Sequence, residues 1–229
     1  MKIFDDDQLL KDALKQFFAK YHFADGGYEL KWFKIKVGFV YIPLPNIPSR
    51  VAVAKIHDIH HVLNEYEATL KGESEIAGWE IASGCGTHFV AWFLNLGSFF
   101  YGLFFFPRAV FKAFMLGRQV RTNYYLTPFV YNELLQQKLG NVRTAIKTNP
   151  PKPLSLSDYL SFIGYCLFTL ALAGVVFYGC WWIVIELMSY LKSPSLQQGE
   201  NNCHNCFGGD SFDNTLYSLY NQLSESCSK

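Results

Sequence analysis

A long apolar run near the C-terminus constrains this chain more than any other feature of its sequence. Residues 162–191 read FIGYCLFTLALAGVVFYGCWWIVIELMSYL and contain one charged residue, Glu186, near the end of the run. A helix of about 20 apolar residues is long enough to cross the hydrocarbon core of a bilayer. Trp181, Trp182 and Tyr190 are residue types that anchor such a helix at the membrane interface. We therefore predict a transmembrane helix over residues 162–191.

The distribution of basic residues predicts how this helix is oriented. Eight Lys or Arg lie between residues 107 and 161, whereas two follow residue 191. Because Lys and Arg accumulate on the cytoplasmic side, we expect a single-pass protein whose N-terminal part is cytoplasmic and whose tail is outside. If residues 89–106 also crossed the membrane, the part of the chain before them would lie outside, and the tail would still lie outside as well.

Residues 89–107, FVAWFLNLGSFFYGLFFFP, form a second apolar run, interrupted by Asn95, Gly97, Ser98 and Gly102. We favour a helix that lines a groove for a hydrophobic tail over a second membrane span, because small residues make room while Phe and Leu form walls. The next stretch, RAVFKAFMLGRQVRTNYY, has an amphipathic pattern. It suits either an anionic membrane surface or an ordinary surface helix.

Composition limits the domain count and the partners. The chain has 229 residues, half of them apolar, with a formal net charge of +1. Nucleic acid is not expected as a partner, because binding phosphates requires a concentrated basic surface. We predict a helical domain over residues 1–149, a linker over residues 150–161, the transmembrane helix, and a polar tail over residues 192–229.

The N-terminal domain is expected to be all-α apart from a short extended arm. We predict an amphipathic helix near the N-terminus, capped by the Asp5 to Asp7 run. Its apolar face suits either packing into the domain or a membrane surface. The apolar residues on that face are Leu9, Leu10, Ala13, Leu14, Phe17, Phe18 and Tyr21. Gly26 and Gly27 end this helix. The following YELKWFKIKVGFVYIPLPNIPS reads as a short strand or arm stopped by Pro43, Pro45 and Pro48.

Residues 57–61, HDIHH, hold half of the chain's six histidines. Ser49 stands where the N-cap of a helix over RVAVAKIHDIHHVLNEY would lie. On that helix His57 and His61 share a face that Asp58 borders, while His60 points elsewhere. A turn at Lys71 and Gly72 would let a second helix offer Glu73. The predicted metal ligands are His57, Asp58, His61 and Glu73.

Several other interpretations of this cluster remain open. The histidines could be surface residues beside solvated acids. A zincin peptidase needs Glu where Asp58 stands. Membrane di-iron enzymes use His-x-x-His-His boxes but need around eight histidines, more than the six in this chain. A His-Asp phosphohydrolase needs a second His-Asp pair, which this sequence lacks. Glu65, Glu67, Glu75 and Glu80 lie near enough in sequence to support the ligands or carry protons, although each also suits a solvated helix face.

The pattern His57-Asp58-x-x-His61, eleven residues, then Glu73 resembles the signature of the ubiquinone (coenzyme Q) biosynthesis family of Coq-four type. The surrounding PNIPSR and HHVLNEYEATLKGESEIAGWEIASGCG are also similar, over about residues 43–88 and more weakly to about residue 145. The resemblance implies an all-α fold, a divalent metal held by these four residues, and a groove for a polyprenyl tail. Zinc is the first expectation for the metal, with iron or manganese as alternatives.

The same resemblance implies a chemistry and partners. It suggests removal of the C1 carboxylate from a polyprenylated hydroxybenzoate, coupled to hydroxylation there, in or at the membrane lipid. Zinc cannot accept electrons, so an oxidative step would need iron, manganese or an outside oxidant. A non-catalytic, lipid-binding organiser of a quinone-biosynthetic complex is the alternative, with other quinone-biosynthesis proteins as partners. A homodimer is compatible with the family.

The remaining cysteines and histidines carry weaker expectations. Cys85 suits a small core residue and His88 a satisfied histidine, although both flank the second apolar run. In the tail, Cys203 and Cys206 form a C-x-x-C around His204, with Cys227 near the end. Without a second C-x-x-C these residues do not predict a zinc site; they could form a disulfide or stay reduced.

Overall fold

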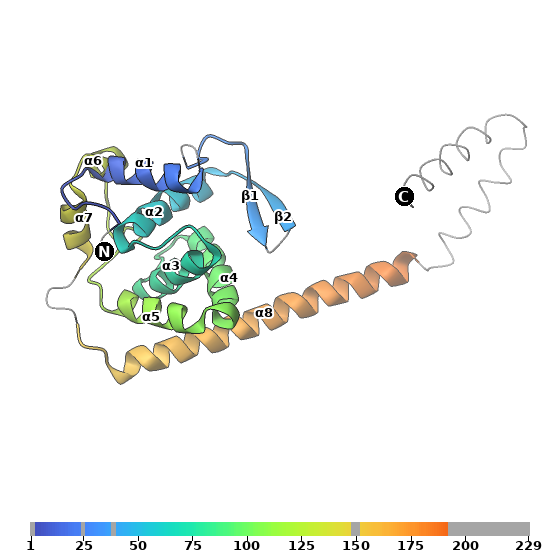
Figure 1. Ribbon diagram of the computed structural model, residues 1–229. Helices are drawn as coiled ribbons and strands as arrows, with labels where there is room; N and C mark the ends of the chain where they lie inside the picture. Colours follow the sequence, from blue (N-terminus) through green and yellow to red (C-terminus); the bar gives the residue numbers. More distant parts are fainter. Residues whose placement is uncertain (1–2, 24–25, 38–39, 148–151, 192–229) are drawn as a thin grey trace, which may run out of the picture. The chain divides into compact units, whose positions relative to one another are not determined.

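The computed structural model describes residues 3–23, 26–37, 40–147 and 152–191. Most of these residues are helical, as predicted, with one two-stranded sheet (Figure 1). The elements are α1 (Leu10–Tyr21), β1 (Trp32–Val37), β2 (Val40–Pro45), α2 (Pro48–Asn64), α3 (Leu70–Ser83), α4 (Phe89–Phe105), α5 (Pro107–Arg118), α6 (Tyr131–Leu135), α7 (Leu139–Ile146) and α8 (Leu156–Leu191).

Helix α1 packs its apolar face into the domain. Its buried side chains are Leu10, Ala13, Leu14, Phe17 and Phe18. The predicted cap was wrong: Leu9 is the N-cap residue and gives no side-chain hydrogen bond. The Leu10 N–H instead donates to the Gln137 carbonyl at 2.9 Å, so a distant segment replaces the aspartate cap.

The extended arm is an antiparallel hairpin rather than one strand. Pro43 and Pro45, which were expected to stop it, lie within β2 opposite Lys34 and Trp32. A two-stranded sheet consists of edge strands alone, and proline is tolerated where its missing N–H would face away from the partner strand.

Helices α2 and α3 carry the predicted metal ligands, and both begin differently from the prediction. Ile47, not Ser49, is the N-cap of α2, because Pro48 supplies a preorganised first helical position. Lys71 and Gly72 belong to the first turn of α3, and the turn between the helices comes earlier in the chain. Thr69 caps α3 by accepting a hydrogen bond from Gly72 N–H at 3.2 Å.

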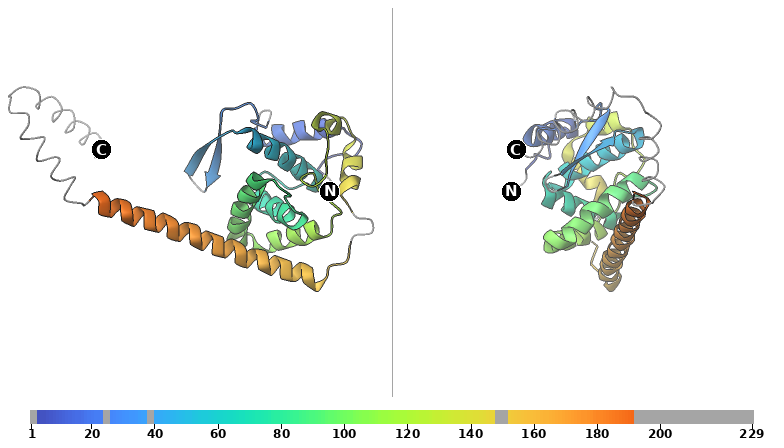
Figure 2. Two further views of the ribbon diagram at one scale, coloured as in Figure 1. Left: turned by 180° about the vertical axis from the view of Figure 1, so that it is seen from behind. Right: turned by 90° about the vertical axis from the view of Figure 1, so that its right-hand side faces the viewer.

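Helix α3 lies between α2 and α5 and is covered on both sides (Figures 1 and 2). Ile76 and Trp79 pack in the cluster formed with α1 and α2, whereas Ala77 and Ile81 pack in the cluster formed with α4 and α5. Gly117 permits the close approach of α5, because a Cβ there would overlap the Trp79 carbonyl. The middle of α3 is therefore held from two directions.

Helix α8 begins at Leu156, six residues before the predicted span. It is the one helix among the described residues that is long and apolar enough to cross a membrane. Its residues from Gly174 onward belong to a second structural unit. Orientation across a membrane and the domain limits stay predictions. The tail cysteines and His204 lie outside the described residues.

Candidate metal centre

Three predicted ligands converge between α2 and α3. His57, His61 and Glu73 each offer a ligand atom, and these atoms all lie within 4.8 Å of one another. The two imidazole Nε2 atoms are 3.1 Å apart, and Glu73 lies 3.2 Å from His57 Nε2 and 3.4 Å from His61 Nε2. This group could hold a metal ion, and two imidazoles with a carboxylate suit several divalent metals.

The hydrogen bonds behind the two histidines turn their Nε2 atoms toward the cluster. His57 donates its Nδ1 proton to Glu80 at 3.1 Å, and His61 donates its Nδ1 proton to the Tyr66 carbonyl at 3.1 Å. With both rings neutral, the two Nε2 lone pairs would face each other beside the Glu73 carboxylate. Such an arrangement needs a positive charge, which a cation or a proton can supply.

The two acids that contact the histidines are held ionised. Burial would raise the pKa of Glu73, but the charge of His61 and hydrogen bonds from both histidines hold that pKa well below its usual value. For Glu80, burial is likewise outweighed by the charge and hydrogen bonds of His57 and by His60, so the pKa is again well below its usual value. Two ionised carboxylates therefore lie beside the histidines, where they favour a positive charge, whether carried by a proton or by a metal ion.

The local backbone explains how these side chains meet. Helix α2 ends at Asn64, and its C-cap residue Glu65 adopts a left-handed conformation (φ 60°) that brings the Tyr66 carbonyl under His61. After this short turn Glu73 lies in the first turn of α3. Gly72 is required there, because a Cβ would overlap the Glu67 carbonyl. Glu73 and Glu80 are two turns apart and share one face of α3.

Asp58 lies next to the cluster without belonging to its three-residue group. Its carboxylate accepts a hydrogen bond from the Tyr28 hydroxyl at 2.5 Å. Burial raises the pKa of Asp58 above its usual value, against the charge of His57 and the Tyr28 bond. Its role as a fourth ligand stays a prediction.

His60 points away from the cluster, as expected. It donates its Nδ1 proton to Glu80 at 2.7 Å and accepts the Tyr124 backbone N–H at Nε2, 3.1 Å away. Both ring nitrogens are used, and burial lowers the pKa of His60, which keeps the ring neutral. His60 therefore holds Glu80 in place and cannot act as a ligand in this conformation.

Of the four acids that the sequence offered as supporting residues, Glu80 is the one that contacts the histidines, and it is buried rather than on a solvated helix face. It is fully buried and accepts hydrogen bonds from His57, His60, Asn95 (2.6 Å) and Tyr125 (3.3 Å). The other candidate acids lie elsewhere: Glu65 pairs with Arg143, Glu67 with Lys20 and Glu75 with Lys71. Two features of the sequence could have pointed to the role of Glu80: its spacing of two helical turns from Glu73, and its place within the apolar stretch IAGWEIA.

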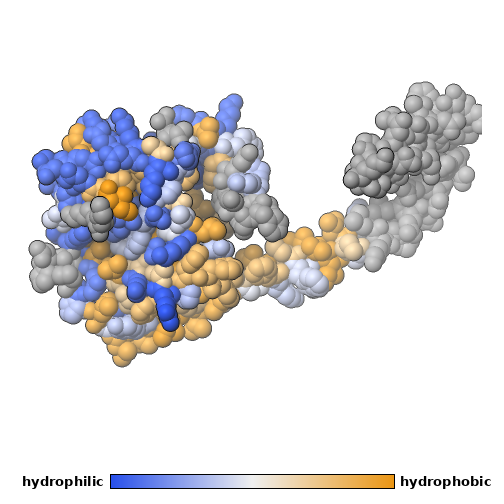
Figure 3. Space-filling model, in the orientation of Figure 1, coloured by the Kyte–Doolittle hydropathy of each residue, from blue (hydrophilic) through white to orange (hydrophobic). Residues whose placement is uncertain are grey.

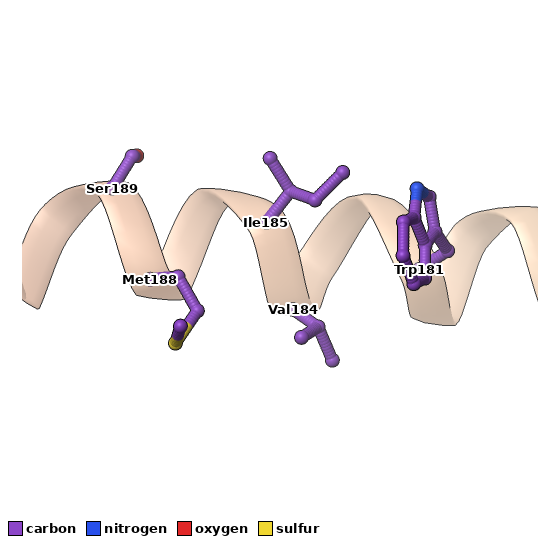
Figure 4. A pocket seen from close by; sticks show the side chains of 5 residues that line it. All are labelled: Trp181, Val184, Ile185, Met188 and Ser189. Carbon is purple, nitrogen blue, oxygen red and sulfur yellow. The ribbon is translucent and has the colours of Figure 1, made fainter.

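Cys85 and His88 are not among the three ligand residues, although the Cys85 thiol donates a hydrogen bond to the Glu80 backbone carbonyl at 3.7 Å. Cys85 is buried and receives a hydrogen bond from Asn95, and His88 packs on the Tyr125 ring. Two surface hollows lie along α8, and neither is lined by a His, Asp, Glu or Cys side chain. The one drawn in Figure 4 measures about 420 Å³ and is lined by Trp181, Val184, Ile185, Met188 and Ser189.

The Glu80 contact leads to a prediction about metal affinity. Glu80→Gln keeps the side-chain shape but removes the charge that receives the His57 Nδ1 proton. Losing such a supporting carboxylate typically weakens metal binding about 10–100-fold. We expect that loss in a competition titration with a zinc chelator, whereas Glu75→Gln, on the same helix without a histidine contact, should bind zinc like the wild type. Equal affinity in both variants would contradict this role.

Comparison with protein-family models, curated proteins and solved structures finds no match. The resemblance to the Coq-four type family therefore rests on the motif and its surroundings in this sequence.

Proposed function

We propose that this chain binds a divalent metal through His57, His61 and Glu73, with Asp58 as a fourth ligand, and acts in ubiquinone biosynthesis. The convergence of the two Nε2 atoms on the Glu73 carboxylate carries the proposal, since these are the residues of the family-like motif. Zinc is the first candidate, with iron or manganese as alternatives.

The proposed substrate is a polyprenylated hydroxybenzoate, from whose ring the C1 carboxylate is removed. In simple decarboxylation the C1–carboxylate bond breaks, carbon dioxide leaves and a proton takes its place. Replacing the carboxylate by a hydroxyl group instead removes two further electrons and needs an external oxidant such as dioxygen. A bound cation supplies a Lewis acid that binds the carboxylate and the neighbouring phenolic oxygen.

The residues around the centre suit this task. The Glu73 side chain is 37% exposed and that of His57 22%, so the cluster can be reached from solvent on their side. His61 is buried under the Phe17 ring, 5.3 Å away. Glu80 and the Tyr66 carbonyl fix the two imidazoles from behind, so the ligands need little reorganisation when a substrate binds.

The membrane location is part of the same proposal. Helix α8 is a candidate span, and we propose that it tethers the metal-site domain on the cytoplasmic side of the membrane that contains the substrate. The main alternative is a non-catalytic organiser that binds polyprenyl lipid and other quinone-biosynthesis proteins, in which the metal shapes the site.

The two functions predict different effects of Glu73→Gln. For an enzyme, release of carbon dioxide from a polyprenyl hydroxybenzoate in detergent falls to background in this variant, because the substrate-facing ligand is lost, while Glu75→Gln stays active. For an organiser, the wild type releases no carbon dioxide with any of the three metals, and Glu73→Gln loses bound lipid or partners. Activity retained in Glu73→Gln would contradict a catalytic centre at this position.

A further inference from the structure

Helix α4 is apolar on two opposite faces, and the protein covers only one of them. Its inner face packs against α3 and α5 through Ala91, Asn95, Phe99 and Gly102. The opposite side carries Phe89, Phe93 and Phe104, which are 78%, 64% and 61% exposed, and Phe105, the last residue of the helix, is 63% exposed next to Phe104; we call these four residues the aromatic face. Isolated exposed phenylalanines are common, but four along one helix mark an interaction surface.

The stretch of chain that carries the aromatic face contains positive charges and no negative charge. No Asp or Glu lies between Glu80 and Glu133 in the sequence. Arg108 and Lys112 are exposed on α5, one helical turn apart, directly after the aromatic end of α4. Neither forms an ion pair with any described residue. A second copy of the chain on this face would bring like charges together, whereas anionic headgroups would neutralise them.

The first turns of α8 pack beside α4 and α5, within the same structural unit. Tyr165 stacks on Trp92 of α4 at 6.2 Å, and Phe162 packs against Phe99 and Phe114. The outer side of these turns is also apolar and exposed at Ile163, Leu167 and Phe168. Figure 3 shows hydrophobic residues gathered along the side of the domain where α5 and the start of α8 lie.

Helix α8 is longer than a membrane span requires, so its first turns can lie on the membrane surface together with α4. The helix has 36 residues, and a bilayer core needs about 20. The turns that pack on α4 and α5 are therefore not required for a span and are free to lie at its edge. Arg118 of α5 ties the beginning of α8 to the domain through Asp158 at 2.8 Å.

We infer that the aromatic face of α4, together with Arg108 and Lys112, docks on a bilayer that contains anionic lipid. The phenylalanine rings enter the region between headgroups and acyl chains, and the two cations bind lipid phosphates. The inner face of the same helix donates the Asn95 hydrogen bond to Glu80. Lipid would then lie about one helix diameter, about 10 Å, from the residue that orients His57.

Photocrosslinking tests this docking in the full chain. Benzoylphenylalanine replaces Phe93 or Phe104, and the protein is reconstituted in vesicles of phosphatidylcholine with phosphatidylglycerol. Phe23, at the end of α1 and 43% exposed, is the matched control position. Mass spectrometry should find lipid adducts at Phe93 and Phe104 and none at Phe23. With Arg108→Gln and Lys112→Gln together, the adduct at Phe104 should fall by up to about 25-fold, about fivefold for each charge.

The outcomes separate the bilayer from other occupants. Crosslinks between two chains at Phe93 and Phe104 would show that the face joins copies of the protein, and absence of lipid adducts would show that it does not touch the bilayer. Either result overturns the inference. Metal content is measured on the same samples, so failure of the proposed metal centre is seen independently of lipid contact.

Discussion

Replacing both His57 and His61 with alanine is expected to abolish metal binding. The two Nε2 atoms supply both nitrogen ligands, and the carboxylates of Glu73 and the proposed ligand Asp58 cannot hold a divalent ion against solvent without them. The loss should exceed the about 10–100-fold expected for Glu80→Gln, because ligands rather than their supports are removed. Inductively coupled plasma mass spectrometry on protein purified in detergent without chelators measures the effect.

A matched variant removes the same number of histidines from elsewhere. His22→Asn with His88→Ala leaves the cluster intact, and asparagine tolerates the left-handed conformation of His22 (φ 57°). This variant should keep the wild-type metal content. If both double variants lose metal equally, the ion is bound by something other than the α2–α3 cluster.

Arg143→Met is expected to cause the largest loss of stability outside the cluster. Arg143 is buried, donates to the Val62 and Leu63 carbonyls at 3.0 and 3.1 Å, and pairs with Asp6 and Glu65. Methionine keeps much of the aliphatic volume but removes the hydrogen bonds that Arg143 donates to these carbonyls and acids. We expect a loss of about 3 kcal/mol in the free energy of unfolding and a lower thermal midpoint by circular dichroism.

The control for this effect is an ion pair on the surface. Lys138 pairs with Asp7 at 3.0 Å, and both side chains are mostly exposed. Lys138→Met should cost less than about 1 kcal/mol, since solvent screens such pairs. Similar losses in the two variants would contradict the idea that Arg143 stabilises the C-terminal end of α2.

Local periodicity was sufficient to predict part of the site. His57 and His61 share one helix, so a spacing of four residues placed both on one face without knowledge of the fold. Glu73 was predicted at the head of the next helix and lies in its first turn. The turn itself was misplaced, because the left-handed conformation of Glu65 ends α2 at a residue with no glycine signal.

The contacts that complete the site join segments far apart in the sequence, and a single sequence does not reveal them. Asn95 and Tyr125 reach Glu80 from α4 and from the segment after α5. Arg143 reaches α2 across about eighty residues of chain. The same reason explains the wrong cap of α1, where a backbone carbonyl from the segment after α6 takes the place of a local aspartate.

X-ray absorption spectroscopy at the edge of the metal that copurifies with the full chain tests the metal centre most directly. We predict near one metal per chain, with a ligand shell of nitrogen and oxygen that contains two imidazoles, from His57 and His61. A shell containing sulfur, or a wild-type protein without stoichiometric metal after gentle purification, would contradict a metal centre between α2 and α3.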